Sequence, residues 1–351
     1  MVSKAMLVVA ALATFAGGAP SDPLELVNGQ AQVMHTRASR GAALDLLAHA
    51  RGSYALRSAG QAYDLKVKFT VTSGGETQYD GAWEMEDVFD PAQGLRWTAK
   101  AEAGYTTTQI AANGVFYGEG TSSTIPLRLQ EARAALFDPI PTERNVDGQV
   151  IRTSTATLNG AQVTCVLFSG TKGAAIPGRR WEETEECIDP QSGLLMVHSQ
   201  IPGRYYAYEY GDAPQAGSYV LPKRVTVTEA GKTVSVISVV SLEELPGVDA
   251  SLFEPTEAML ARGPSIEMAE AQKLSRAAGK SISTVAQPVG VFGLVTAAGE
   301  LVEAHSLQPA DPNSAAAIED AKQINFSHPA GTGGRPRQYF VFVIEKFVAS
   351  Q

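Results

Sequence analysis

The sequence contains few of the residues that build reactive centres. Its 351 residues include only two cysteines and five histidines, and these show no CxxC or HExxH spacing of the kind that binds zinc. The nucleophile motif GxSxG is absent, and no glycine-rich stretch ends in Lys-Ser or Lys-Thr as a phosphate-binding loop does. We therefore predict no metal site, no cofactor and no catalytic residue, and we expect that the protein is not an enzyme.

Positive charge is also scarce. The chain has 28 Lys and Arg residues against 37 Asp and Glu residues, which gives a net charge of −9, and the basic residues form no long cluster. Nothing is available to neutralise a phosphate backbone or to adhere to anionic lipid, so nucleic acid is not an expected partner. A hydrophobic content of 44% is typical of a folded globular protein, and this length fits two domains with appendages.

The N-terminal apolar run is too short to cross a membrane. It extends from Ala5 to about Ala16, after Lys4 and before the small residues around Ala19. Spanning a bilayer takes roughly 20 apolar residues, whereas this order of charge, apolar core and small residues is typical of a secretory signal. We predict a signal peptide over residues 1–19, with a retained membrane anchor as the alternative, and a periplasmic or secreted protein.

The two cysteines, Cys165 and Cys187, would then reach an oxidising compartment. They lie in segments that read as successive strands, so a cross-strand disulfide between them is predicted. In the chain-entropy model, a bridge that closes a loop of this size contributes about 3 kcal/mol.

Alternation of apolar and polar residues is the main pattern in the first 254 residues. In DLKVKFTVT, the apolar side chains from Leu65 to Val71 share one face and the polar ones share the other, which predicts a half-buried strand. Similar runs recur from Trp83 to Leu242 and give about ten strands. Helix-forming residues predict one leading helix over 31–51 and one inserted helix over 125–139.

Two unusual runs have ordinary structural interpretations. The acidic run EETEE, residues 182–186, places neighbouring carboxylates on alternate faces of a strand, which suits a solvated edge better than a pair of catalytic acids. In YYAYEY, residues 205–210, the tyrosines are expected to cover a core and to keep their hydroxyls in water.

The leading helix, the long antiparallel strands, the inserted helix and the closing phrase GVDASLFEP resemble the LolA/LolB-type half-barrel of periplasmic lipoprotein carriers, over residues 25–254. The resemblance implies a concave apolar surface that holds acyl chains under a lid of helices. The candidate groove residues are the inward-facing apolar ones of the early strands: Leu65, Val67, Phe69, Val71, Trp83 and Trp97.

A second unit follows a predicted helical linker over residues 255–288. Residues 289–307 read as strand, turn and strand, residues 311–324 as a helix with Asp311 as its N-cap, and the last strand as apolar on both faces. The β-β-α-β order predicts a compact domain over residues 289–348.

This unit, with its approach from about residue 285, resembles the TonB C-terminal domain. The features that match are Gly299 in the turn, two helix alanines, the Phe326 region and the apolar strand that ends at Phe347. The resemblance implies that a partner peptide adds to the sheet edge as an extra strand. The candidate docking residues are Tyr339, Val341, Val343 and Phe347.

The sequence thus predicts an α+β protein in which a large antiparallel half-barrel, with helices over one face, precedes a small β-β-α-β domain. The expected function is to bind a hydrophobic or lipid-like ligand in the half-barrel and to dock an envelope protein through the second domain. A structural or interaction protein of the cell envelope that binds no ligand is the alternative. A homo-oligomer is possible on either interpretation.

Overall fold

The computed structural model describes residues 23–27, 31–72, 80–121, 126–137, 139–140, 142, 148–170, 179, 183–264, 275–278, 288–295, 300–307, 309, 311–324 and 339–346. The predicted signal peptide and Phe347 lie outside these residues.

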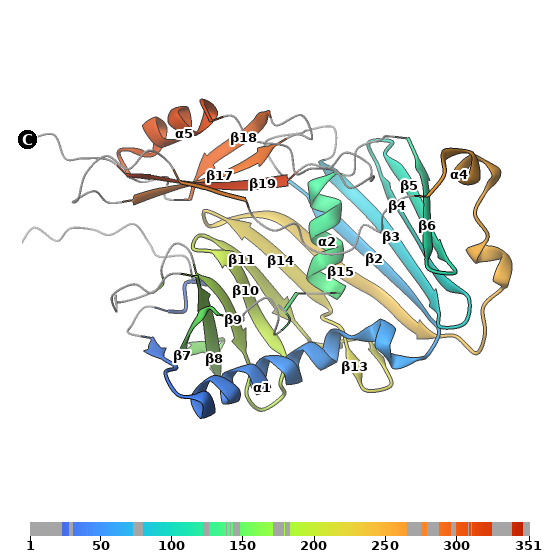
Figure 1. Ribbon diagram of the computed structural model, residues 1–351, viewed down its shortest axis with the longest axis horizontal. Helices are drawn as coiled ribbons and strands as arrows, with labels where there is room; N and C mark the ends of the chain where they lie inside the picture. The colour runs from blue at the N-terminus through green and yellow to red at the C-terminus, as the bar shows by residue number, and fades with distance from the viewer. Residues whose placement is uncertain are drawn as a thin grey trace, which may run out of the picture.

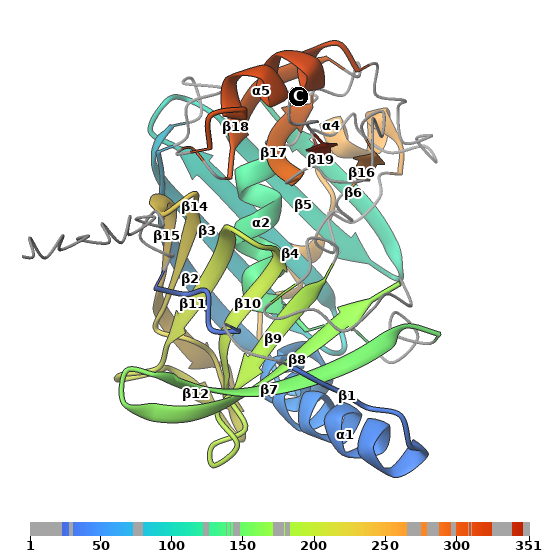
Figure 2. The ribbon, with the colours of Figure 1, turned by 90° about the vertical axis from the view of Figure 1, so that its left-hand side faces the viewer.

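A 13-stranded antiparallel sheet forms most of the molecule (Figures 1 and 2). Its order is β1-β7-β8-β9-β10-β11-β14-β15-β2-β3-β4-β5-β6. In chain order the strands are β1 (Gln32–Val33), β2 (Tyr63–Val71), β3 (Gly81–Asp90), β4 (Gly94–Ala101), β5 (Thr106–Ala112), β6 (Val115–Gly120), β7 (Val150–Leu158), β8 (Ala161–Ser169), β9 (Thr184–Ile188), β10 (Leu195–Ile201), β11 (Arg204–Glu209), β14 (Arg224–Glu229) and β15 (Lys232–Glu244). The predicted antiparallel half-barrel is therefore present.

The order of the strands explains where the inserted helix lies. One run of hairpins extends from β2 to β6 and another from β7 to β15, and the pairing of β15 with β2 joins them. The chain must therefore return from one edge strand, β6, to a position near the other edge, β7. Helix α2 (Leu127–Phe137) lies on this return path, inside the concave face (Figure 2). It matches the predicted helix over 125–139.

Helix α1 (Arg37–Tyr54) closes one end of the half-barrel (Figure 1). Thr36 caps it, because the Thr36 hydroxyl accepts a hydrogen bond from the Ser39 amide at 3.0 Å, which satisfies one free donor of the first turn. The predicted start at residue 31 is wrong, since Gln32 and Val33 pair with β7 as a strand. The short helix η1 (Leu56–Ala59) follows α1 directly, and the small hairpin of β12 (Gln215–Ala216) and β13 (Tyr219–Val220) lies beside α1 (Figure 1).

A second unit covers the opposite end of the half-barrel (Figure 1). Its strands β17 (Pro288–Val295) and β18 (Leu301–Ser306), helix α5 (Ser314–Lys322) and strand β19 (Tyr339–Lys346) follow the predicted β-β-α-β order. Helix α5 begins at Ser314, later than predicted, because Asp311 caps the preceding turn by accepting from the Asn313 amide. We call β17, β18, α5 and β19 the C-terminal unit.

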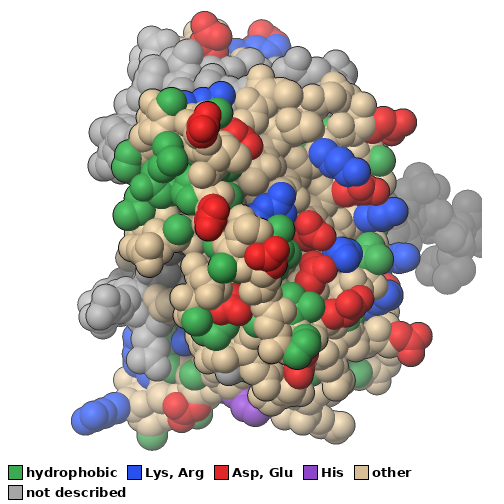
Figure 3. Space-filling model, turned by 90° about the vertical axis from the view of Figure 1, so that its right-hand side faces the viewer, with side chains coloured by type: hydrophobic (Ala, Val, Ile, Leu, Met, Phe, Trp, Pro, Cys, Tyr) green, Lys and Arg blue, Asp and Glu red, His purple; other side chains and the backbone are tan. Residues whose placement is uncertain are grey.

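The convex face of the large sheet is partly solvated and partly covered. Lys68, Lys100 and Glu84 form an exposed cross-strand ladder on it, and Figure 3 shows side chains of both signs interspersed on this side of the molecule. The linker covers another part, where η3 (Ala250–Phe253) and α4 (Glu257–Arg262) pack against β5 and β6. Among the described residues, no helix is long and apolar enough to cross a membrane.

Candidate functional site

The six predicted groove residues share the concave face of the large sheet. Phe69 and Trp83 are opposite each other on β2 and β3, with their rings stacked at 5.2 Å. All six belong to one core cluster that also contains residues of both α1 and α2, and their exposed fractions are only 0–2%. The sequence therefore identified one continuous apolar face, but in this structure the face is buried in a core that it shares with both helices.

Helix α2 packs its apolar residues, Leu129, Ala132, Ala135 and Leu136, into the core of this face, and its polar side chains are buried as well. Arg128, Gln130, Glu131 and Arg133 are all buried, and the helix has little amphipathic character because the sheet wraps around it. Near Trp97, the Arg133 guanidinium lies 4.3 Å from the centre of the ring and its Nη1 is 3.0 Å from Asp87 Oδ2. Asp87 in turn accepts a hydrogen bond from the Tyr63 hydroxyl at 2.9 Å. One end of α2 is thus anchored by charge in the middle of the predicted groove.

The other end of α2 is anchored in a second buried charge cluster. Arg128 Nη1 lies 2.8 Å from Glu229 Oε1 on β14 and 2.8 Å from Glu131 Oε2. Glu131 also forms an ion pair with Arg204 of β11, and Arg204 Nε lies 3.0 Å from Glu229 Oε1. Burial alone would raise the pKa of Glu229, but the Arg128 charge, the contact with His305 and the Arg204 charge hold it well below its usual range.

Tyrosines connect this charge cluster to the α1 end of the half-barrel. Tyr206 and Tyr208 project from the same face of β11, because successive side chains of a strand alternate, and Tyr210 follows directly after the strand. The Tyr206 hydroxyl donates to Glu131 at 2.5 Å, and the Tyr210 hydroxyl contacts that of Tyr54 on α1. Tyr208 is buried, and among the described residues its hydroxyl has no hydrogen-bond partner. The sequence prediction that the hydroxyls of this run stay in water is wrong for Tyr205, Tyr206 and Tyr208, which are all buried.

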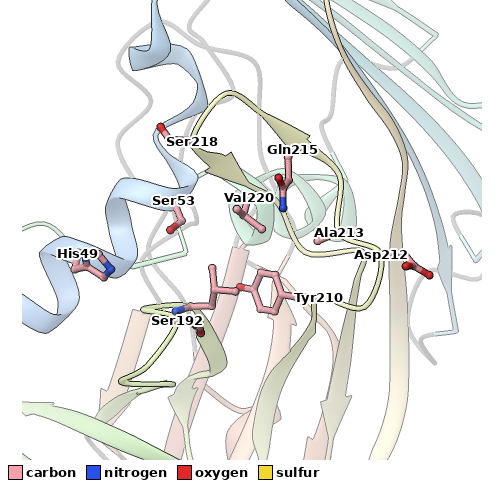
Figure 4. A pocket seen from close by; sticks show the side chains of 10 residues that line it. His49, Ser53, Ser192, Tyr210, Asp212, Ala213, Gln215, Ser218 and Val220 are labelled. Atoms are coloured by element: carbon pink, nitrogen blue, oxygen red, sulfur yellow. Dashed lines mark hydrogen bonds between the residues drawn. The ribbon is translucent and has the colours of Figure 1, made fainter.

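An open pocket of about 630 Å³ lies at the end of this row, between α1, the turn before β10 and the β12–β13 hairpin. Figure 4 shows Ser53, Gln215 and Tyr210 around the same space, with the Asp212 carboxylate turned away from it. Tyr210 also packs against the core of the concave face. The pocket is therefore an opening to water beside the covered apolar face, and its lining residues include no Lys or Arg.

One wall of the pocket depends on a glycine. His49 of α1 lies so close to the turn that a Cβ at Gly193 would be 2.1 Å from His49 Cδ2. Gly193 also has φ +71°, which is strained for a residue with a side chain.

The acidic run of β9 is buried, which corrects the prediction of a solvated edge. Glu183, Glu185 and Glu186 are all 0% exposed. Their partners are Arg152 at 2.8 Å, Arg179 at 2.9 Å and His198 at 2.9 Å, respectively. A buried carboxylate persists only where it is paired, so the acidic run belongs to the interior of the sheet. Arg152 is 31 residues from Glu183 in the sequence, whereas Arg179 is only six residues from Glu185. The run alone did not reveal that its strand lies inside the sheet.

Cys165 and Cys187 form the predicted disulfide. They lie directly opposite each other on β8 and β9, and both are fully buried. Their sulfurs and a Glu185 oxygen are close enough together to suggest a metal site, but disulfide sulfurs are not thiolate ligands. The bridge therefore holds two strands together.

The predicted docking strand β19 has a strand on each side. It pairs with β17 along its whole length, and β16 (Ser275–Ala278) pairs with it in parallel over Val341–Ile344. The expectation of an open edge at these residues is wrong, because part of the predicted helical linker forms this strand. Tyr339, Val341 and Val343 remain predicted docking residues, and Phe347 lies outside the described residues.

No family model matches the chain, and no curated protein matches it. Several solved structures are similar to it. Three of them are a DUF1329 family protein from Desulfovibrio piger (TM-score 0.38, 10% identity), a putative outer membrane lipoprotein-sorting protein domain from Vibrio parahaemolyticus (0.36, 9%) and the LolA superfamily protein NE2245 from Nitrosomonas europaea (0.36, 9%). The matches cover 62%, 59% and 60% of this chain and 98%, 95% and 96% of the other chains, respectively. None of the three is a TonB C-terminal domain.

Proposed function

We propose that the protein binds a hydrophobic, lipid-like molecule against the concave face of its large sheet, in the place that α2 occupies in this structure. It acts as a non-enzymatic protein of the periplasm or of a secreted fraction. One observation carries the proposal: a concavity lined by aromatic and branched apolar residues is covered by a short helix that is anchored mainly through charge.

The energetics of α2 favour its exchange for a ligand. Its large, fully buried apolar side chains are Leu129 and Leu136, and burying each stabilises by about 1.5–3 kcal/mol. Buried ion pairs add little net stability, because desolvation offsets their attraction. An acyl chain of about twelve methylenes gains roughly 10 kcal/mol at about 0.8 per methylene, before ordering costs. Moving α2 away also leaves Asp87 without Arg133 and Glu229 without Arg128, which is costly for buried charges. Such a chain therefore replaces α2 only where the gain from its burial exceeds that cost.

The pocket beside Tyr210 provides for the polar end of the ligand. Tyr210 belongs both to the pocket wall and to the core of the concave face. A chain held on that face therefore reaches water at this point with its polar end, and the buried Tyr208 hydroxyl lies along the same row of tyrosines.

Quenching of tryptophan fluorescence by 9,10-dibromostearic acid tests the proposal. Bromine quenches an indole only at short range, and Trp83 and Trp97 both lie on the concave face. In a Trp181→Phe background, which leaves these two as the only tryptophans, we expect saturable quenching by the brominated acid and none by stearic acid.

Trp83→Phe and Trp97→Phe, each in the same background, provide the controls, since each removes one reporter and keeps an aromatic ring. Each should lose part of the quenching and still bind. If the brominated acid binds without quenching either tryptophan, or if no lipid binds, the proposal is wrong.

The complete burial of the six groove residues supports a second function. A sheet filled by its own side chains fits a structural or interaction protein that takes no ligand. The titration with 9,10-dibromostearic acid distinguishes the two functions, because in the second case α2 stays in place and neither tryptophan is quenched.

We also propose, in line with the predicted resemblance of the C-terminal unit, that an envelope partner docks on β19 as an added strand. Since β16 already pairs with Val341–Ile344, the partner must replace β16 at these residues. A peptide that binds should therefore increase hydrogen exchange at the β16 amides, and a peptide that leaves this exchange unchanged would argue against docking there.

A further inference from the structure

The C-terminal unit and helix α2 meet at the same buried residue, Glu229. His305 of β18 reaches it from the C-terminal unit, with Nε2 3.3 Å from Glu229 Oε2. Arg128 of α2 reaches the other carboxylate oxygen at 2.8 Å. The carboxylate is 1% exposed, so solvent does not substitute for either partner. One carboxylate therefore links the helix inside the half-barrel to the unit that covers its end.

Arg204 forms a second link at the same place. Its guanidinium carbon lies 5.0 Å from the ring centre of Phe292 on β17, while the same side chain forms ion pairs with Glu131 of α2 and with Glu229. Beside it, a Cβ at Gly203 would be 3.0 Å from Leu307 Cβ, so the two units are in close contact. The C-terminal unit thus helps to fix the orientation of Arg204 and Glu229, which together with Tyr206 hold this end of α2.

We infer that Glu229 is a positioning residue through which the docked C-terminal unit keeps α2 on the concave face and so lowers the affinity for ligand. This inference rests on the proposed function. When the C-terminal unit is docked, Glu229 and Arg204 are oriented to receive Arg128 and Glu131. When a partner draws the C-terminal unit away, that end of α2 loses its oriented ion pairs, and a lipid replaces the helix more easily.

Linkage requires the reverse effect as well. If docking of the C-terminal unit disfavours ligand binding, a bound ligand must weaken docking by the same factor. The loaded protein therefore exposes its C-terminal unit to a partner more readily than the empty protein does. This would couple loading of the half-barrel to recognition of the partner.

The test uses the full chain and two readouts. His305→Ala removes the contact of the C-terminal unit with Glu229 and leaves the concave face intact. We expect it to raise the affinity for 9,10-dibromostearic acid by about fivefold or more, within the usual range for coupled sites. Hydrogen exchange of the α2 amides should also become faster. Glu319→Ala, on the exposed face of α5, is the matched control and should change neither readout.

A double-variant cycle separates positioning from a general loss of structure. Glu229→Gln keeps the shape of the side chain and removes its charge, and it should speed exchange of α2. In that background His305→Ala should have no further effect, because both changes act through the same carboxylate. Additive effects of the two variants would overturn the inference.

Arg133→Ala distinguishes the two proposals, because it loosens α2 at Asp87, away from the C-terminal unit. If Arg133→Ala raises the affinity and His305→Ala does not, the coupling is wrong and ligand binding stands. If no variant binds the acid, the proposed function fails. The coupling is then judged by α2 exchange alone, and unchanged exchange in His305→Ala overturns it.

Discussion

At the scale of single residues, the interior of this sheet is unusual for its buried polar groups. Glu185, Asp87 and Glu229 all lie below the surface with arginine partners. Such groups add little net stability when they are paired and cost much when one partner is removed. Replacing one of these residues therefore lowers the free energy of unfolding strongly only where the change leaves a buried charge without a partner.

Tyr208→Phe should stabilise the protein. The variant removes a buried hydroxyl that has no hydrogen-bond partner among the described residues, and leaving such a group unsatisfied costs about 1–3 kcal/mol. We expect the free energy of unfolding in urea to rise by about 1 kcal/mol. Tyr206→Phe is the control from the same strand and should lower it, because its hydroxyl donates to Glu131. If both variants lower it equally, the Tyr208 hydroxyl has a partner after all.

Glu185 should make stability depend on pH. Burial raises its pKa to about 7, against the opposing charge of Arg179, whereas glutamate in an unfolded chain titrates near pH 4.3, at about its reference value. The folded state thus binds the Glu185 proton more tightly than the unfolded state does. The stability that this proton binding contributes is fully present in acid and is lost as the pH rises to about 7. Glu185→Gln should match the wild type near pH 5 and exceed its free energy of unfolding at pH 8 by about 2–3 kcal/mol.

Equilibrium unfolding in urea at each pH checks this prediction. Glu84→Gln is the control, because Glu84 is exposed and the hydrogen bond with Lys100 lowers its pKa. The stabilisation that comes from the lowered pKa of Glu84 is lost only as the pH falls below the pKa of glutamate in the unfolded chain. The difference in free energy of unfolding between Glu84→Gln and the wild type should therefore be the same at pH 5 and at pH 8. An equal response of both variants would mean that burial does not control the titration of Glu185.

At the scale of elements, different pairs of neighbouring strands are held together by different kinds of contact. The β2–β3 pair combines a stacked Phe69 and Trp83 on the inside with the Lys68 and Glu84 ion pair outside. The β8–β9 pair instead has the disulfide on one face and buried ion pairs beside it. Strand β8 ends at Ser169 and β9 begins at Thr184, so the connection between them is longer than a tight hairpin and the two strands gain more from a covalent link.

Removal of the disulfide should therefore be costly. Cys165 and Cys187 are 22 residues apart, and closing such a loop contributes about 3 kcal/mol in the chain-entropy model. The double variant Cys165→Ala, Cys187→Ala should lower the free energy of unfolding in guanidinium by about this amount. Addition of reductant should then have no further effect on the variant, and a reductant-sensitive transition in the variant would contradict this account.

At the scale of the whole molecule, the proposed function requires α2 to leave the concave face when the ligand binds. With saturating stearic acid, the α2 amides should exchange faster, while those of β2 and β3 should exchange more slowly, because the ligand binds only the folded sheet. Hydrogen exchange followed by mass spectrometry measures both segments in one sample. Uniform slowing of exchange in all segments would mean that α2 stays in place and that the lipid binds elsewhere.

Much of this architecture could be predicted because the relevant signals are local. The alternation in Leu65–Val71 identified a strand and its inner face, and the order of elements after residue 288 identified the C-terminal unit. The partners of buried charges could not be predicted, since Arg152 and Glu183, or Arg128 and Glu229, meet only after the sheet has formed. The acidic run was misread because the sequence does not show that β9 lies between two other strands inside the sheet, and β16 was missed because its four residues carry no strand pattern.

The pairing of β15 with β2 also limits how the protein can be made. The two strands are separated by about 160 residues of chain. The edge of β2 that pairs with β15 therefore stays unpaired until nearly the whole half-barrel has been synthesised. Loop closure over such a span is slow, and an unpaired edge in a growing chain is prone to aggregate. Biogenesis of this protein should therefore depend on a chaperone that holds the first hairpins until residue 244 has been delivered.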